Sequence, residues 1–187
     1  MKKVTLMIVV ATMMTGLCSA QDTETTTYFG EKNGFEIDFP SDWGVSLVET
    51  KVMFAYNTTL IGVIGDTPGA VVQLRVTYPC KNPKSDMKSW LSIFEKGAKK
   101  SKDPKFLIHS QGEGSTPGGK EFSYVDYTYT LVGEDGQGTI TRRKFYVTCN
   151  SIKGTRFSFA FFFETNEQDW DKFKTIYENI FNSVTYK

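Results

Sequence analysis

The sequence has 187 residues, of which 40% are hydrophobic and 23% charged, a composition that excludes a fibrous or wholly disordered chain and is typical of one packed globular domain. A formal net charge of +1 argues against a protein that binds nucleic acid through a basic excess. Aromatic residues are abundant, with 15 Phe, 9 Tyr and 3 Trp, and favour a sheet-rich core over a helical bundle.

The first 20 residues are typical of a cleaved signal peptide. Two lysines form a short positive region, and the apolar stretch at 4–17 is short for a membrane span. Cys18 raises lipid attachment as an alternative, but the bulky Leu17 before it favours simple cleavage. We therefore expect an exported chain, in a bacterial periplasm or outside the cell. Cleavage would remove two lysines and no acidic residue, which lowers the formal charge to −1.

The region after the signal peptide begins with a polar, threonine-rich stretch. We predict a disordered lead-in over residues 21–29 and a single domain over residues 30–187. The domain opens with segments of strand character that are separated by turn residues. These strands are predicted over residues 34–39, 43–56, 59–65 and 70–78.

A helix is predicted next, with Ser85 or Asp86 as its N-cap, because apolar side chains recur there with helical spacing at Met87, Trp90, Leu91, Phe94 and Ala98. Further strands are predicted over residues 105–112, 120–132, 139–150 and 155–164. The last predicted helix follows a capping box of Thr165 and Gln168, and its inner stripe is Trp170, Phe173, Tyr177, Ile180 and Phe181.

The strand predicted over 155–164 has one face made of phenylalanine, with Phe157, Phe159, Phe161 and Phe163. Such a face needs an apolar cover, and the apolar stripes of the two predicted helices are the expected partners. The pattern therefore predicts an α+β fold, a largely antiparallel β-sheet flanked by two amphipathic helices.

Several stretches of the sequence resemble the PsbP-like family. The opening GFEIDFPSDWGVS contains an aromatic-Pro-x-x-Trp motif at Phe39, Pro40 and Trp43. The proline ends a strand, and the tryptophan ring anchors the next one. Similarity continues through the helix MKSWLSIFEKGAKK, the strand GGKEFSYVDYTYT and the closing FSFAFFFETNEQDWDKFKTIYENIFNSVTY.

The resemblance implies a PsbP-like sandwich and an accessory role rather than an enzymatic one. Family members include extrinsic subunits of the photosynthetic oxygen-evolving complex, a eukaryotic Ran-binding protein of similar fold and exported bacterial proteins. No ligand cluster in this sequence matches a metal site of the photosynthetic members. We therefore carry over no cofactor, no metal and no photosynthetic role.

Export would leave Cys80 and Cys149, each at the end of a predicted strand. Counting strand directions between them places both at the same end of the sheet. A disulfide in an oxidising compartment and a pair of free structural thiols are both compatible with this placement.

The residues capable of chemistry are few, and we assign no catalytic, cofactor-binding or metal-binding residue. His109 is the only histidine, and a strand-edge position is favoured over a metal ligand because no His or Cys stands at ligand spacing. Ser110 is its chain neighbour and should point to the opposite face. Cys80 or Cys149 could serve as a nucleophile with it only if reduced.

Asp126 lies in a tyrosine-rich strand. A half-buried carboxylate among rings would be an acid/base candidate. A polar, partly exposed surface is the favoured interpretation, because Asp126 alternates onto one face with Phe122, Tyr124, Thr128 and Thr130. For Tyr124, Tyr127 and Tyr129, packing is favoured over a recognition surface.

Two loops and one basic run have simple structural interpretations. Residues 114–121 match a phosphate-binding loop up to Lys120, but Glu121 replaces the Ser/Thr, and a strand follows, so a hairpin loop is predicted. Residues 132–138 are also predicted as a turn, since they lack alternating calcium ligands. The basic run 142–144 is interpreted as a solvated strand end.

Two functional hypotheses remain. The favoured one is an exported, non-catalytic binding or accessory protein that docks on an envelope or secreted protein partner. The alternative is a small-molecule-binding protein or weak hydrolase with a pocket between sheet and helix that involves His109 and Asp126.

Overall fold

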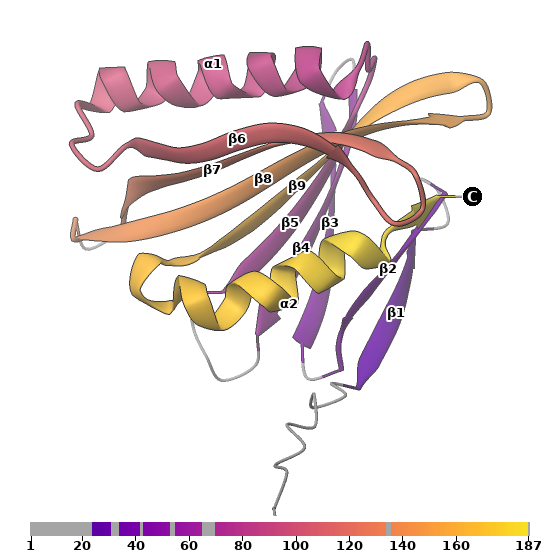
Figure 1. The fold of residues 1–187 in the computed structure, drawn as a ribbon, viewed down its shortest axis with the longest axis horizontal. Coiled ribbons are helices and arrows are strands. Elements are labelled where there is room, and N and C mark those ends of the chain that lie inside the picture. The colour runs from indigo at the N-terminus through magenta and orange to yellow at the C-terminus, as the bar shows by residue number, and fades with distance from the viewer. Residues whose placement is uncertain are drawn as a thin grey trace, which may run out of the picture.

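The structure is a computed structural model that describes residues 24–30, 34–41, 43–52, 55–64, 70–133 and 136–186. Most of the chain forms one seven-stranded antiparallel sheet, with strand order β3-β4-β5-β9-β8-β7-β6 (Figure 1). Its strands are β3 (Trp43–Val52), β4 (Ala55–Ile64), β5 (Val71–Thr77), β6 (Leu107–Ser115), β7 (Glu121–Val132), β8 (Gly138–Ile152) and β9 (Thr155–Asn166). Consecutive strands pair as hairpins everywhere except between β5 and β6.

A three-stranded sheet with order β1-β2-β10 completes the fold. It is formed by β1 (Thr25–Gly30), β2 (Phe35–Pro40) and β10 (Thr185–Tyr186). The strand β1 corrects the predicted disordered lead-in over 21–29 for residues 25–29, while residues 21–23 lie outside the described residues. Its threonines are β-branched and suit a strand, and it gains antiparallel partners along the whole of β2. The predicted signal peptide and Cys18 lie outside the described residues.

The two helices cover opposite faces of the seven-stranded sheet (Figure 1). One is α1 (Pro83–Ser101), which connects β5 to the far edge of the sheet at β6. The other is α2 (Trp170–Ser183), which follows a 3-10 turn, η1 (Glu167–Asp169). This arrangement confirms the predicted α+β class with an antiparallel sheet flanked by two helices.

The face toward α2 holds the larger core. Phe159, Phe161 and Phe163 are wholly buried there, beneath α2 and the three-stranded sheet. The prediction that both helices cover this face is wrong, because α1 packs on the other side. There, Phe162 stacks on Phe145 with ring centroids 4.3 Å apart, and rings of α1 close over them. Strand β9 thus buries both of its faces.

Both helix starts differ from the predicted ones. The cap of α1 is Asn82, three residues before Ser85 and four before Asp86, because Asn82 accepts a 2.8 Å hydrogen bond from the Ser85 N–H and Pro83 suits the first turn. The capping box predicted at Thr165 does not form. Thr165 extends β9, and α2 starts only at Trp170, after the 3-10 turn.

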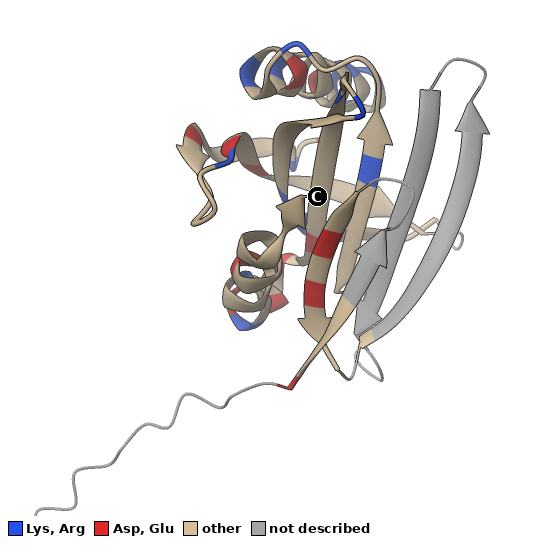
Figure 2. Cartoon of the chain, turned by 90° about the vertical axis from the view of Figure 1, so that its right-hand side faces the viewer, with Lys and Arg blue, Asp and Glu red and all other residues tan. Residues whose placement is uncertain are grey.

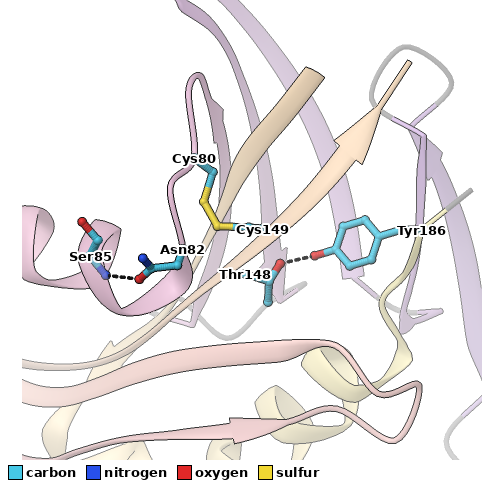
Figure 3. The surroundings of a disulfide bond; sticks show 6 residues. All are labelled: Cys80, Asn82, Ser85, Thr148, Cys149 and Tyr186. Carbon is cyan, nitrogen blue, oxygen red and sulfur yellow. Dashed lines mark hydrogen bonds between the residues drawn. A yellow bond between two sulfur atoms is a disulfide. The ribbon is translucent and has the colours of Figure 1, made fainter. Parts of the chain in front are cut away.

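A disulfide joins Cys80 to Cys149, with Cα atoms 6.0 Å apart (Figure 3). It ties the segment before α1 to β8, so the predicted placement of both cysteines at one end of the sheet is confirmed. Beside it, the Thr148 and Tyr186 hydroxyls share a short hydrogen bond that links β8 to β10. Burial raises the pKa of the Tyr186 phenol, although the bond with Thr148 lowers it in part.

Candidate functional site

His109 lies on β6, the edge strand of the sheet, and its side chain is exposed. The interpretation as a strand-edge histidine is therefore confirmed. The pairing of β6 with β7 shifts by one residue between Ile108 and Ser110. His109 occupies this bulge, so the simple alternation expected along the strand does not hold there.

Asp126 is buried, with 6% of its surface exposed, so its interpretation as part of a partly exposed polar surface is wrong. Its two carboxylate oxygens accept hydrogen bonds of 2.9 Å from Nε and NH2 of Arg142. The Arg142 guanidinium in turn lies 4.8 Å from the ring centre of Trp170 on α2. No hydrogen bond among the described residues joins Asp126 to His109, so the structure does not assemble the proposed acid/base pair.

Arg143 points to the opposite face and enters a second buried cluster. Its Nε donates to the Glu164 carboxylate at 2.6 Å, and its NH2 donates to the Tyr129 hydroxyl at 2.7 Å. Tyr129 donates to the same carboxylate oxygen at 2.6 Å. Burial raises the pKa of the Tyr129 phenol well above its usual range, and the nearby guanidinium offsets this only in part. The Arg143 hydrogen bonds to Tyr127 and Tyr129 make these rings part of the packing.

Lys144 completes the basic run and is also paired. Its ammonium donates to Glu178 on α2 at 2.8 Å and lies 5.5 Å and 5.3 Å from the ring centres of Tyr124 and Tyr146. The prediction that residues 142–144 form a solvated strand end is therefore wrong. Each cation is instead matched by a carboxylate on another strand or helix. Figure 2 shows that the charges on both helices are of mixed sign.

The cysteines have no free thiolate in this structure, because they are bonded to each other. Within the described part of the chain, the one group of potential metal ligands consists of Cys80, Cys149 and Asp86, with ligand atoms within 4.8 Å of one another. The disulfide removes two of the three ligands from that group. Residues 114–121 form the β6–β7 hairpin, as predicted, rather than a phosphate-binding loop.

Strand β6 is one of the two edge strands of the described seven-stranded sheet, and β3 is the other. Strand β6 pairs only with β7, and its C-terminal half has a regular register up to Ser115. Glycines stand opposite aromatic residues there. A Cβ at Gly112 would approach the Tyr124 ring to 2.9 Å, and one at Gly114 would approach Phe122 to 2.7 Å. The two rings therefore lean over the edge strand itself.

A hollow opens on the α2 side of the sheet, between β7, β8 and α2, and we call it the α2-side groove. It has a volume of about 280 Å³ and is lined by Phe122, Tyr124, Lys144, Tyr146, Glu178, Phe181 and Asn182. Rings dominate its walls, and its one cation, Lys144, is already paired with Glu178. Such a groove suits an apolar or aromatic side chain.

A second hollow opens on the α1 side of the sheet, beside β6, and we call it the α1-side groove. It has a volume of about 240 Å³ and is lined by Lys84, Met87, Lys88, Leu91, Gln111, Gly112, Glu113, Ser123 and Tyr124. Ser123 is 3% exposed, and its hydroxyl has no hydrogen-bond partner among the described residues. Tyr124 belongs to the lining of both grooves.

A larger and more open hollow, of about 370 Å³, lies at the C-terminal end of α1. Of its two carboxylates, Glu95 is exposed and Asp103 already accepts hydrogen bonds from Thr130 and from the Lys105 N–H. This hollow therefore offers no unpaired buried group, in contrast to the α1-side groove.

None of the helices formed by the described residues is long and apolar enough to cross a bilayer.

Sequence reasoning names Tyr124 among three candidate recognition tyrosines but does not identify the grooves. The structure separates these tyrosines, because Tyr127 and Tyr129 belong to the packed cluster around Arg143, whereas Tyr124 lines the two grooves. One signal was available in the sequence. Gly112 and Gly114 alternate along β6 opposite the alternating rings Phe122 and Tyr124 of β7, a pattern of side chains leaning over an edge strand.

No protein-family model matches the sequence, and no curated protein is significantly similar to it. Solved structures do share the fold. Cyanobacterial PsbP (CyanoP) from Synechocystis sp. PCC 6803 aligns with a TM-score of 0.62 and 15% identity, over 90% of this chain and 96% of CyanoP.

Two further structures align less closely. LpqN of Mycobacterium tuberculosis, a protein described as involved in cell envelope biogenesis, has a TM-score of 0.50 and 14% identity, over 87% of this chain and 90% of LpqN. A protein from Bacteroides thetaiotaomicron VPI-5482 has a TM-score of 0.51 and 10% identity, and the alignment covers 86% of this chain but 48% of that protein. The resemblance to PsbP in the sequence is thus matched in three dimensions, and the chain has a PsbP-like α+β sandwich fold.

Proposed function

We propose that this chain is an exported, non-catalytic accessory protein that docks on a protein partner of the cell envelope. The partner contributes an extended segment that pairs with the free edge of β6 as an additional strand. Strand addition satisfies the open backbone groups of an edge, and grooves beside the edge select the partner's side chains.

The observation that carries the proposal is the position of the two grooves. They lie on opposite faces of the sheet, the α1-side groove is lined in part by β6 itself, and Tyr124 of the neighbouring strand β7 lines both. The side chains of an added strand alternate between these two faces. One edge therefore provides both the backbone partner and two side-chain sites.

Two observations support a location outside the cytoplasm. The Cys80–Cys149 disulfide is typical of an oxidising compartment, and residues 1–20 have the pattern of a signal peptide. The fold is shared with LpqN, which is described as involved in cell envelope biogenesis. A non-catalytic role is supported by the engagement of the chemically capable groups, because Asp126 and Glu164 pair with arginines and the cysteines with each other.

The test is site-specific photocrosslinking in the organism that makes the protein. A photoreactive residue replaces the exposed Gln111 on β6 and, as a matched control, the exposed Thr175 on α2. We expect a discrete crosslinked protein from position 111 and none from position 175. Absence of a crosslink at 111, or the same products at both positions, would contradict docking at this edge.

The α1-side groove favours one further candidate, a small-molecule-binding protein with its pocket between sheet and helix. Neither His109 nor Asp126 lines that pocket, and Ser123 is its buried polar group without a hydrogen-bond partner among the described residues. Native mass spectrometry of the gently purified protein, compared with the denatured sample, separates the candidates. Retained protein mass supports docking, whereas retained small-molecule mass supports a ligand pocket.

A further inference from the structure

We propose that the segment bound beside β6 alternates aromatic and acidic side chains, so that a ring enters the α2-side groove and a carboxylate enters the α1-side groove. This inference deepens the proposed function and rests on it. Three features of the described residues carry it: the different chemistry of the grooves, an unpaired lysine and an unpaired buried hydroxyl.

The α2-side groove selects an apolar ring. Phe122 and Tyr124 are half-buried there, beside the buried rings of Tyr146 and Phe181. The Phe122 ring packs edge-to-face on Phe181, with centroids 5.2 Å apart at 88°, and Tyr146 stacks on the same Phe181 ring. An incoming aromatic side chain can extend this packing without leaving a charge unpaired, because Lys144 keeps its partner Glu178.

The α1-side groove has a different charge balance. Lys84 is paired with Glu113 at 2.7 Å, whereas Lys88 forms no ion pair with any described residue. Lys88 lies one helical turn after Lys84, so two cations face a single carboxylate. The lining also contains Met87 and Leu91, which can pack against an aliphatic stem. An acidic side chain complements this combination, and a basic one would be repelled.

The Ser123 hydroxyl gives the groove a hydrogen-bond donor. A buried hydroxyl without a partner destabilises the free protein, so its position in a groove lining is consistent with a partner that arrives with the ligand. A carboxylate oxygen is a strong acceptor for such a donor. Ser158 is the other buried hydroxyl without a partner among the described residues, but it lines neither groove.

The alternation follows from strand geometry. Successive side chains of an extended strand point to opposite faces of a sheet, and the two grooves lie on opposite faces of this sheet. Neighbouring residues of the bound segment therefore enter different grooves. This places the aromatic and the acidic residue next to each other in the partner's sequence.

The test uses the full mature protein and blocked heptapeptides as probes. One peptide alternates Phe with Glu, the second alternates Phe with Lys, and the third alternates Ser with Glu. Binding is measured by calorimetry, and hydrogen exchange reports protection of the β6 amides. We expect the Phe/Glu peptide to protect β6 and to bind at least about tenfold more tightly than either of the other peptides. Each of the others lacks one contact, either the charge-assisted hydrogen bond or the buried ring.

Two pairs of variants locate the acidic contact. Ser123→Ala should weaken binding of the Phe/Glu peptide about tenfold while the melting temperature stays equal or rises, because an unpaired buried hydroxyl is removed. Ser158→Ala makes the same chemical change away from the grooves and should leave binding unchanged. Lys88→Gln should likewise weaken binding, and Lys96→Gln, an exposed lysine of α1 outside the groove lining, should not.

The results that overturn the inference differ from those that overturn strand addition. If the Phe/Lys peptide protects β6 and binds as tightly as the Phe/Glu peptide, alternating recognition fails while strand addition stands. Equal effects of Ser123→Ala and Ser158→Ala on binding would also overturn it. If no peptide protects β6 and the position 111 crosslinks are absent, the docking proposal itself fails. If sedimentation shows a dimer and hydrogen exchange shows that a second copy of the chain protects β6, the proposed occupant of this edge is wrong.

Discussion

The elements that cover the two faces of the seven-stranded sheet are held in place in different ways. On the α2 face, a helix and a second sheet enclose Phe159, Phe161 and Phe163, which are wholly buried. On the α1 face, a single helix packs over Phe145 and Phe162, and its own rings Trp90 and Phe94 remain partly exposed. The α2 face is therefore stabilised mainly by area removed from water.

Helix α1 is instead held against the sheet by covalent and hydrogen-bond contacts at its two ends. Before its first turn, the Cys80–Cys149 disulfide ties the chain to β8. After its last turn, Asp103 accepts hydrogen bonds from the N–H and the hydroxyl of Thr130 on β7, both at 2.7 Å. A helix held at both ends need not fill all of the sheet beneath it. The α1-side groove can therefore stay open beside β6, where the proposed partner strand binds.

The largest expected effect comes from neighbouring phenylalanines of β9 that face opposite ways. Phe161→Ala should lower the free energy of unfolding by about 4–5 kcal/mol, and Phe162→Ala by about 3 kcal/mol, because the α1 face is less completely enclosed. Urea unfolding followed by fluorescence measures both. Equal losses, or a larger loss for Phe162→Ala, would contradict the difference between the faces.

The second largest loss of stability is expected on removal of the disulfide. Replacing Cys80 and Cys149 by Ala should lower the free energy of unfolding by about 4 kcal/mol, the chain-entropy estimate for a bridge between residues 69 apart. The first turn of α1 should exchange its amides faster, while α2 should not. Reduction of the unmodified protein is the control and should reproduce both changes. Faster exchange in both helices would mean that the bridge supports the whole fold rather than α1.

Elements with strict periodicity could be predicted from the sequence. The helical spacing of Met87, Trp90 and Phe94 and the alternating phenylalanines of β9 identify their elements and burial. Strand counting also places the two cysteines together. Strand β1 was not predicted because its threonine-rich sequence has no apolar alternation, and its strand structure comes with its pairing to β2.

The paired charges could not be predicted, because their partners are distant in the sequence. Arg142 pairs with Asp126, 16 residues away, and Arg143 with Glu164, 21 residues away. The local pattern of consecutive charged residues in a strand is the same whether the strand is solvated or covered. The α1-side groove depends in addition on the position of β6 at the edge of the sheet, and strand order is a property of the whole chain.

The cluster of Arg143, Glu164 and Tyr129 on the α1 face should contribute less to the free energy of unfolding than the disulfide. Glu164→Gln should lower the free energy of unfolding by about 2 kcal/mol, because it leaves the Arg143 guanidinium without its carboxylate at a site where both side chains are less than one fifth exposed. The double variant Arg143→Met and Glu164→Gln should lose less than the sum of the single changes. Additive losses in a double-mutant cycle would show that the two groups do not interact.

The smallest expected effect on stability concerns the hydrogen bonds of Asp103 that hold the C-terminal end of α1. Burial raises the pKa of Asp103, but hydrogen bonds from Thr130 and Lys105 outweigh it, so the pKa lies below the usual value of 3.8. A lowered folded-state pKa means that the unfolded chain binds the proton first. The stabilisation from Asp103 is therefore complete above pH 3.8 and is lost as the pH falls through the folded-state value. Asp103→Asn should lower stability slightly at pH 7, and the difference from the unmodified protein should shrink in urea titrations below that pH. A difference that stays constant down to the acid limit would show that the carboxylate charge does not fasten the helix.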